Sequence, residues 1–217
     1  MAERPRLTLI TPVLGEDAEG YAERLAAACA AGDVAAVVLR LGAADERTLV
    51  NRVKVLTPGA QEAGAAVVVA CDDPSLDLAQ VSARGGADGV HVDTIGEAGL
   101  KRLRAARERA RDGRIVGAGR LRSRDDAMAA GEAGADYLMF GDPRPDGSLP
   151  AAEATAERAA WWAEIFETPC VAAGADADAG TLAATGAEFV GIVLGDDPAA
   201  QVTAAEAAMR AATAGTA

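Results

Sequence analysis

The sequence predicts an α/β barrel of parallel strands, because one short phrase recurs along the chain and an apolar run follows each copy. Gly-Ala-Asp or Gly-Ala-Glu stands at residues 86–88, 134–136 and 186–188, and looser copies begin at Gly32 and Gly64. A left-handed glycine commonly ends a helix, and an unbroken apolar run is typical of a strand buried on both faces. Such joints in series predict consecutive strand–helix units.

Eight of these units fit in 217 residues, which is the lower end of the size range of a closed (β/α)8 barrel. Strands are expected at Leu7–Val13, Ala35–Leu41, Ala66–Ala70, Gly89–Asp93, Ile115–Ala118, Tyr137–Phe140, Cys170–Ala173 and Phe189–Leu194. Helices are expected at Ala18–Ala31, Glu46–Ala63, Leu76–Arg84, Gly96–Arg111, Arg124–Ala133, Ala152–Glu167, Ala179–Ala184 and Ala199–Ala212. An open doubly wound sheet is the alternative, and the missing Gly-x-Gly-x-x-Gly turn disfavours it. We predict a single TIM-barrel domain over residues 1–217.

Composition limits the kind of partner. The net charge of −12 argues against nucleic acid and anionic membrane surfaces, but it leaves room for a small phosphorylated ligand. No stretch approaches the ~20 apolar residues that span a bilayer, and no signal-peptide pattern opens the chain. Cys29, Cys71 and Cys170 form an odd, unspaced set, which predicts free thiols in a reducing cytoplasm.

The candidate site residues are those that follow the strands, because barrel active sites form at the carboxyl ends of the strands. Arg40 ends the second predicted strand, Asp72 follows the third, and Asp93 ends the fourth. The remaining loops supply Gly119, Arg120, Asp142, Arg144, Gly174, Leu194 and Gly195. Arginine suits phosphate because its planar fork can bind two oxygens at once. These loops therefore predict a site for a charged small molecule.

Several of these segments together resemble the thiamine phosphate synthase and thiazole tautomerase family, nearly end to end. The most specific match is Gly86-Ala87-Asp88-Gly89-Val90-His91-Val92, which is similar to the family's fourth strand. Supporting matches are Leu39-Arg40, the region of Asp72, Gly134-Ala135-Asp136-Tyr137 with Phe140-Gly141, and residues 169–174.

The resemblance implies a (β/α)8 barrel that joins a pyrimidine methyl diphosphate to a thiazole phosphate, with Mg²⁺ holding the diphosphate. By position, Arg40 would contact the leaving diphosphate, and Asp72 or Asp73 would ligate Mg²⁺. The backbone around Gly174 and Leu194-Gly195 would bind the thiazole phosphate. Gly119, Arg120 and Arg144 would then line the substrate site.

The chain also departs from the family pattern. Gly42 replaces a lysine, Asp93-Thr94 replaces Gly-Gln, and Gly119-Arg120-Leu121 stands where the synthase has serine and histidine. Arg144 lies in a loop that normally carries threonine and lysine, and Ala175 replaces the second glycine of a pair. The tautomerase needs a histidine in the fifth loop, but His91 is the only histidine of the chain. We expect a divergent synthase of slow or no activity, or alternatively a non-catalytic phosphate-binding or interaction protein.

Each candidate also has a structural interpretation. Arg120, Arg122 and Arg144 could supply the lost positive charge, or they could pair with surface acids. Asp72 and Asp93 could hold Mg²⁺, whereas Asp73 is expected to cap a helix. His91 is expected to be a hydrogen-bonded interior residue rather than a catalytic one.

Two further patterns concern the last third of the chain. Asp196-Asp197-Pro198 is expected to cap the final helix. Trp161 and Trp162 cannot share one face of their helix, so one ring is expected to be exposed. A homodimer contact at that ring is left open.

Overall fold

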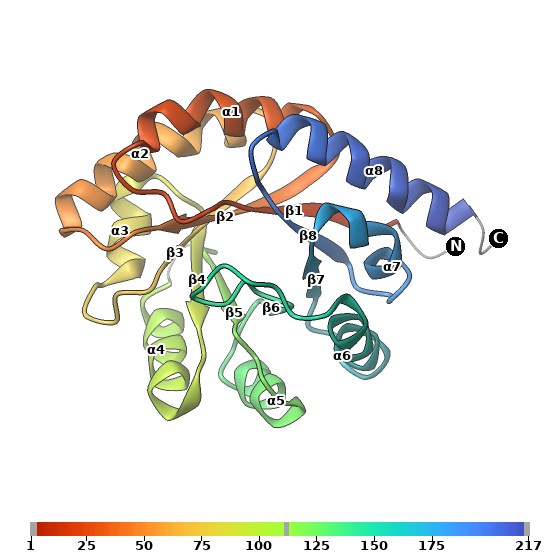
Figure 1. Ribbon diagram of the computed structural model, residues 1–217. Coiled ribbons are helices and arrows are strands. Elements are labelled where there is room, and N and C mark those ends of the chain that lie inside the picture. The colour runs from red at the N-terminus through yellow and green to blue at the C-terminus, as the bar shows by residue number, and fades with distance from the viewer. Residues whose placement is uncertain (1–3, 111–112, 215–217) are drawn as a thin grey trace.

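Within residues 4–110 and 113–214, which the computed structural model describes, eight parallel strands close into a barrel in chain order, with helices outside it (Figure 1). The strands are β1 (Arg6–Ile10), β2 (Val34–Leu41), β3 (Ala66–Cys71), β4 (Gly89–Asp93), β5 (Ile115–Gly119), β6 (Tyr137–Phe140), β7 (Cys170–Gly174) and β8 (Phe189–Val193). The helices are α1 (Ala18–Ala30), α2 (Glu46–Glu62), α3 (Leu78–Gly85), α4 (Gly96–Arg109), α5 (Arg124–Glu132), α6 (Ala152–Ile165), α7 (Ala179–Ala183) and α8 (Pro198–Ala214). The TIM barrel is confirmed, and the open sheet is excluded.

The recurring phrase has a structural role at both of its ends. Its glycine adopts a left-handed backbone at Gly86, Gly134 and Gly186. Its acid then reaches back to the start of the preceding strand: Asp88 accepts the N–H of Val67 at 2.7 Å, and Asp136 accepts that of Val116 at 2.8 Å. Glu188 accepts the N–H of Cys170 at 2.9 Å in the same way. The acids therefore satisfy backbone donors at the amino-terminal end of the barrel.

The looser copy at Gly32 was predicted to have the same turn, and that prediction was wrong. Gly32 lacks the left-handed conformation, and its role is close packing. A Cβ there would lie 2.8 Å from the side chain of Val202 and 2.9 Å from that of Glu206. Only a residue without a side chain lets α8 approach so closely.

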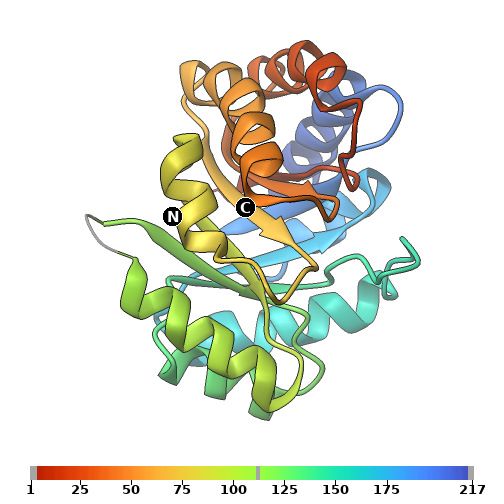
Figure 2. The ribbon, with the colours of Figure 1, turned by 90° about the vertical axis from the view of Figure 1, so that its left-hand side faces the viewer.

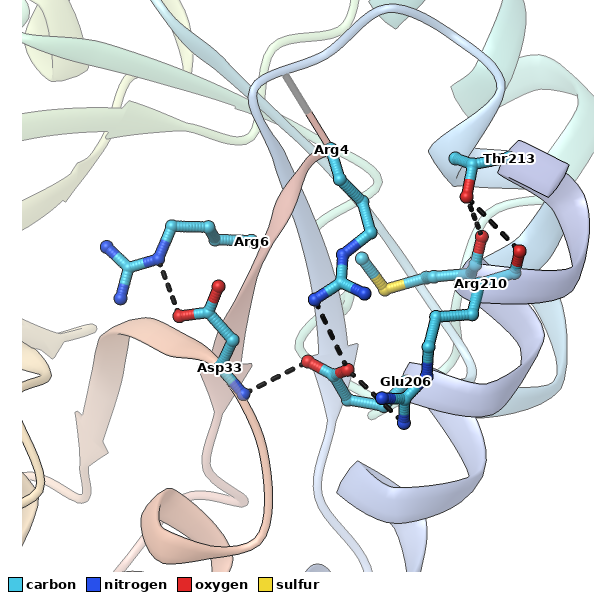
Figure 3. Close-up of polar contacts among 7 residues, drawn as sticks. Arg4, Arg6, Asp33, Glu206, Arg210 and Thr213 are labelled. Atoms are coloured by element: carbon cyan, nitrogen blue, oxygen red, sulfur yellow. Dashed lines mark hydrogen bonds and ion pairs between the residues drawn. The ribbon is translucent and has the colours of Figure 1, made fainter. Parts of the chain in front are cut away.

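Glu206 connects α8 to the first two strands (Figure 3). Its side chain is buried and accepts the N–H of Asp33 at 3.0 Å. Arg4 lies 3.7 Å away and Arg210 lies 3.5 Å away, so the buried carboxylate has two positive partners. These contacts attach α8 to the residues that precede β1 and β2.

Two apolar layers fill the fold. Inside the barrel, Ile10, Val38, Val68, Met139 and Val171 pack together. Between barrel and helices lies a larger layer, and α3 and α4 cover β3 and β4 on the side seen in Figure 2. No helix of the described residues is long and apolar enough to cross a bilayer.

The predicted boundaries lie within two residues of the observed ones, except at the end of the first strand. The first strand ends at Ile10 rather than Val13, because Pro12 has no N–H to donate to the sheet. The third helix begins at Leu78 rather than Leu76. The predicted end of the fourth helix, Arg111, lies outside the described residues.

The prediction that Asp73 caps the third helix was wrong. Asp77 is the capping residue, and it accepts the N–H of Gln80 at 3.2 Å. Asp73 instead accepts the N–H and O–H of Ser75 in a tight turn, because a short carboxylate can satisfy the donors two residues later. The cap at the last helix is confirmed, since Asp197 accepts the N–H of Ala200.

The prediction that one ring of Trp161 and Trp162 is exposed is confirmed only in part. Trp162 is buried and stacks on Phe166, with ring centroids 4.0 Å apart. Trp161 is half-buried rather than fully exposed, and the guanidinium of Arg124 lies 4.7 Å from its ring centroid. A homodimer through Trp161 remains a prediction.

Candidate active site

A small cavity of about 30 Å³ opens at the carboxyl end of the barrel. Its floor is apolar, formed by Ile10, Val38 and Met139 from the barrel interior. Its wall carries the charged residues that the strand ends supply, which are Arg40, Asp72, His91, Asp93, Arg120 and Asp142. The fold thus brings together Arg40, Asp72, Asp93 and Arg120 from the carboxyl ends of four neighbouring strands.

Arg40 is the cation of this wall that has no anionic partner. Its backbone N–H is held by the hydroxyl of buried Thr11 at 2.9 Å, which fixes the carboxyl end of β2. Among the described residues, the guanidinium makes no hydrogen bond and no ion pair. Its five N–H donors are therefore available to a ligand in the cavity.

His91 lies on β4 at the centre of a buried chain of polar groups. Burial raises the pKa of Tyr137 well above its ordinary value, so its hydroxyl stays protonated and donates to Nδ1 of His91 at 2.7 Å. Nε2 then donates to the Asp142 carboxylate at 3.1 Å. His91 is thus a hydrogen-bonded interior residue, as predicted.

Asp142 also holds Arg120 in place. Its second carboxylate oxygen accepts the backbone N–H of Arg120 at 3.1 Å. Arg120 has a φ of 59°, and it is the described non-glycine residue with a left-handed backbone. Such a conformation costs about 1–3 kcal/mol and persists only where neighbouring groups enforce it. Asp142 is the neighbour that enforces it, and the guanidinium is directed toward Asp93 at 3.6 Å.

Gly119 makes this arrangement sterically feasible. A Cβ at that position would lie 2.2 Å from Nε2 of His91 and 2.3 Å from Oδ1 of Asp142. The missing side chain leaves room for the bond between β4 and the loop after β6. The role of Gly119 is therefore to leave space for the hydrogen bond between His91 and Asp142, and it has no side chain that could contact a ligand.

Asp72 and Asp93 are the candidate metal ligands. Burial, above all, raises the pKa of Asp93; the nearby Asp142 and Asp72 carboxylates add to this, whereas His91 and Arg120 oppose it. A buried carboxylate near two others favours an additional cation. Mg²⁺ typically takes one or two carboxylates and completes its shell with water and phosphate oxygens, and Asp72 and Asp93 both line the mouth cavity. Among the described residues, no cluster of three or more acidic, histidine or cysteine side chains forms a metal site.

The loops after β7 and β8 do not line this cavity. The N–H of Leu194 donates to the carbonyl of Ile10 at 2.9 Å, and the N–H of Gly195 donates to Oε1 of Gln201 at 2.6 Å. Arg24 donates to the carbonyls of Gly195 and Asp196. A phosphate at Gly195 would therefore have to displace Gln201.

Gly174 has a close neighbour of its own. A Cβ there would lie 2.9 Å from Leu182 and 3.6 Å from the carboxylate of Asp178, so an acid borders the loop after β7.

Sequence comparisons identify the family. The model of the thiamine monophosphate synthase family matches residues 7–195. The chain belongs to this family. A thiamine-phosphate synthase of Rhodospirillum centenum is 41% identical over 193 residues, 86% of each chain. One of Hyphomonas neptunium is 36% identical over 216 residues, which cover 93% of this chain and 92% of that protein.

Solved structures agree on the fold of this thiamine-phosphate synthase family member. A thiamine phosphate pyrophosphorylase from Pyrococcus furiosus superposes with a TM-score of 0.72 at 22% identity, covering 95% of this chain and 96% of that one. The family match spans all the loops that carry the candidate residues.

Arg144, like Gly174, Leu194 and Gly195, is a predicted substrate residue that does not line the mouth cavity. It lies in the loop after β6, and its guanidinium donates to Ser148 Oγ at 3.1 Å and to the carbonyl of Leu149 at 3.0 Å. It lines a different cavity and does not reach Arg40. The partnership of Asp142 with His91 and Arg120 was missed from the sequence. The one available signal was Gly119, a residue without a side chain on the strand beside His91.

Proposed function

We propose that this chain catalyses the family reaction, in which a pyrimidine methyl diphosphate and a thiazole phosphate are joined and diphosphate is released. A bond between the pyrimidine methylene carbon and the diphosphate oxygen breaks, and the thiazole nitrogen bonds to that carbon. Negative charge develops on the leaving diphosphate. Its stabilisation by preorganised cations is the main catalytic requirement.

Arg40 is the observation that carries this proposal. It is the cation in the mouth cavity without an anionic partner among the described residues, and the family resemblance assigns the leaving diphosphate to it. Arg120 supplies a second positive charge on the same wall, partly neutralised by Asp93. We assign the leaving diphosphate to these two guanidinium groups.

Asp72 and Asp93 would hold Mg²⁺ beside them. When bound, the ion would neutralise charge on the diphosphate. The raised pKa of Asp93 fits this role, because a neighbouring cation would favour its ionised form. Asp142 and His91 keep Arg120 oriented and do not contact the ligand in this assignment.

We further propose that turnover is slow. Gly42 and Gly119 stand where the family supplies a lysine and a serine, and Arg144 is directed away from the mouth. The loss of one preorganised donor can cost ~10²–10³ in rate, and coupled losses do not add simply.

Turnover with both family substrates and Mg²⁺ tests the proposal. We expect product well below a typical enzyme rate of about 1 s⁻¹, and we expect Arg40→Ala and Asp72→Ala to abolish it. Arg104→Ala, an exposed arginine of α4, is the matched control and should keep the rate.

Two outcomes would change the assignment. A wild-type rate of about 1 s⁻¹ or more would refute slow turnover. Binding of either phosphate without product would instead support a non-catalytic phosphate-binding protein on the same barrel.

A further inference from the structure

A second cavity opens at the amino-terminal end of the barrel, opposite the mouth. Its volume is about 310 Å³, about ten times that of the mouth cavity. We call it the basal cavity. Its lining comes from the beginnings of β1, β2, β3, β5, β6, β7 and β8. Among the described residues, none lines both cavities, so the basal cavity is separate from the candidate active site.

The apolar layer inside the barrel separates the two cavities. Ile10, Val38 and Met139 form the floor of the mouth. Val68 and Val171 belong to the same layer and line the basal cavity instead. A molecule in the basal cavity is therefore kept from the charged wall of the mouth.

Small side chains leave the amino-terminal end of the barrel unfilled. Thr8, Ala36 and Ala66 lie side by side on three strands, because the register pairs Thr8 with Ala36 and Ala36 with Ala66. Each stands two residues before a member of the interior layer, so all three side chains face the barrel interior. Bulky branched residues dominate such interior layers in most barrels. Two alanines in this row leave the space that forms the basal cavity.

Two aromatic rings also line the basal cavity. Tyr137 and Phe189 face the barrel interior from β6 and β8, yet both are only half-buried. The Tyr137 ring lies against Gly117, where a Cβ would be 2.1 Å from its Cζ, and the Tyr137 hydroxyl donates to His91. Tyr137 therefore offers its ring to the cavity and not its hydroxyl. Aromatic side chains pack favourably against another ring.

The hydroxyl of Thr8 is a polar group without a partner in this apolar lining. Thr8 is 2% exposed and lines the basal cavity. Within residues 4–110 and 113–214, its hydroxyl makes no hydrogen bond to a side chain or to the backbone. Most buried side-chain polar atoms have a hydrogen-bond partner. A molecule in the basal cavity would supply the partner that the chain does not.

The charged residues of the lining already have partners. Arg6 donates from Nε to Asp33 at 2.8 Å (Figure 3). Asp136 accepts the N–H of Val116 at 2.8 Å and a guanidinium N–H of Arg107 at 2.7 Å. An ionic ligand would lose its hydration on entry without meeting an unpaired charge of opposite sign. The lining therefore favours an uncharged ligand.

We propose that the basal cavity binds a small uncharged molecule that carries an aromatic ring and one hydrogen-bonding group. The ring would pack against Tyr137 and Phe189, and the polar group would bond to the hydroxyl of Thr8. The space is sufficient, because an apolar cavity of about 150 Å³ already accommodates benzene. The proposal goes beyond the family reaction and does not depend on it, since this binding can be measured without either phosphorylated substrate.

Titration of the full chain with phenol and with toluene, followed by ligand-observed NMR, tests the proposal. The two probes share one ring, and toluene has a methyl group where phenol has its hydroxyl. We expect both probes to bind the wild-type protein. Thr8→Val keeps the shape of the side chain and removes its hydroxyl. This variant should bind phenol about fivefold more weakly, the scale of one neutral hydrogen bond, and should bind toluene as the wild type does.

Cavity-filling variants locate the binding. Ala66→Leu places a larger side chain in the basal cavity and should abolish binding of both probes. Ala27→Leu adds the same volume on the exposed surface of α1 and is the matched control, which should bind both probes normally. Circular dichroism verifies folding, and Ala36→Leu fills the same cavity from β2 if Ala66→Leu does not fold.

Three outcomes would each overturn the proposal. The first is the absence of wild-type binding of both probes. The second is binding that the cavity-filling variants leave unchanged or that Ala27→Leu reduces equally. The third is a Thr8→Val variant that affects phenol and toluene alike.

Discussion

Nε2 of His91 lies 3.1 Å from Oδ1 of Asp142, and both side chains are less than one-tenth exposed. The bond connects β4 to the loop after β6 across the position where Gly119 of β5 has no side chain. Asp142 in turn holds the N–H of Arg120. One buried contact therefore sets the orientation of a cation at the mouth.

Gly119→Ala should break this contact. The new methyl group would lie 2.2 Å from the imidazole and 2.3 Å from the carboxylate, and both are buried. We expect a loss of about 1–3 kcal/mol in the free energy of unfolding, the usual cost of overpacking, measured by urea denaturation. Gly20→Ala on α1 is the control, since nothing lies within 4 Å of its Cβ; it should not destabilise the protein. Equal effects of the two changes would contradict the role assigned to Gly119.

Glu206→Ala should destabilise the fold more than Glu206→Gln. Alanine leaves the N–H of Asp33 without its acceptor, whereas glutamine keeps an oxygen there and loses only the charge (Figure 3). The hydrogen bond is part-buried, so its loss should cost about 1 kcal/mol. Thermal or urea unfolding of both variants measures the difference. A glutamine variant as unstable as the alanine variant would show that the ion pairs with Arg4 and Arg210 contribute more than the hydrogen bond.

Thiol reactivity should distinguish Cys71 from the other two cysteines. Burial raises the pKa of Cys29 to about 11 and that of Cys170 to about 12, so almost no thiolate forms at neutral pH. Cys71 is half-buried at the mouth, and burial raises its pKa as well. A thiol reagent should modify native protein slowly and at Cys71 alone, and denatured protein at all three positions. Fast native labelling of Cys170 would contradict the buried placement.

The same pKa shifts predict a loss of stability in alkali. A thiol with a raised pKa in the folded state keeps its proton while the unfolded chain loses it. Stability is therefore complete below the ordinary thiol pKa of 9.0 and falls as the pH rises toward about 11. Urea midpoints at pH 8 and pH 10 measure the fall, and Cys29→Ala should reduce it. An identical pH dependence in that variant would assign the fall to other groups.

Gln201→Ala tests whether the loop after β8 binds the thiazole phosphate. The N–H of Gly195 donates a hydrogen bond to Oε1 of Gln201, whereas the family resemblance assigns this N–H to the phosphate. If the assignment holds, the variant should bind thiazole phosphate more tightly, by roughly the value of one hydrogen bond or about fivefold. Calorimetry measures the change. Weaker binding would mean that Gln201 itself contacts the ligand.

The sequence by itself determined the number and order of the strand–helix units. Gly86, Gly134 and Gly186 end helices in the left-handed conformation, and the apolar runs after them have no polar face to expose. Both effects are local, so they can be recognised without the rest of the fold. Closure of the barrel followed from the count of eight such units.

Only the tertiary structure decided which charged side chains share a cavity. Arg120 and Arg144 are equivalent in the sequence, as arginines in consecutive loops, yet Arg120 lines the mouth and Arg144 does not. Asp142 holds Arg120 from 22 residues away, whereas Ser148 and Leu149 anchor Arg144 from within its own loop. The direction of a loop side chain depends on partners that only folding brings near, so no local pattern encodes it.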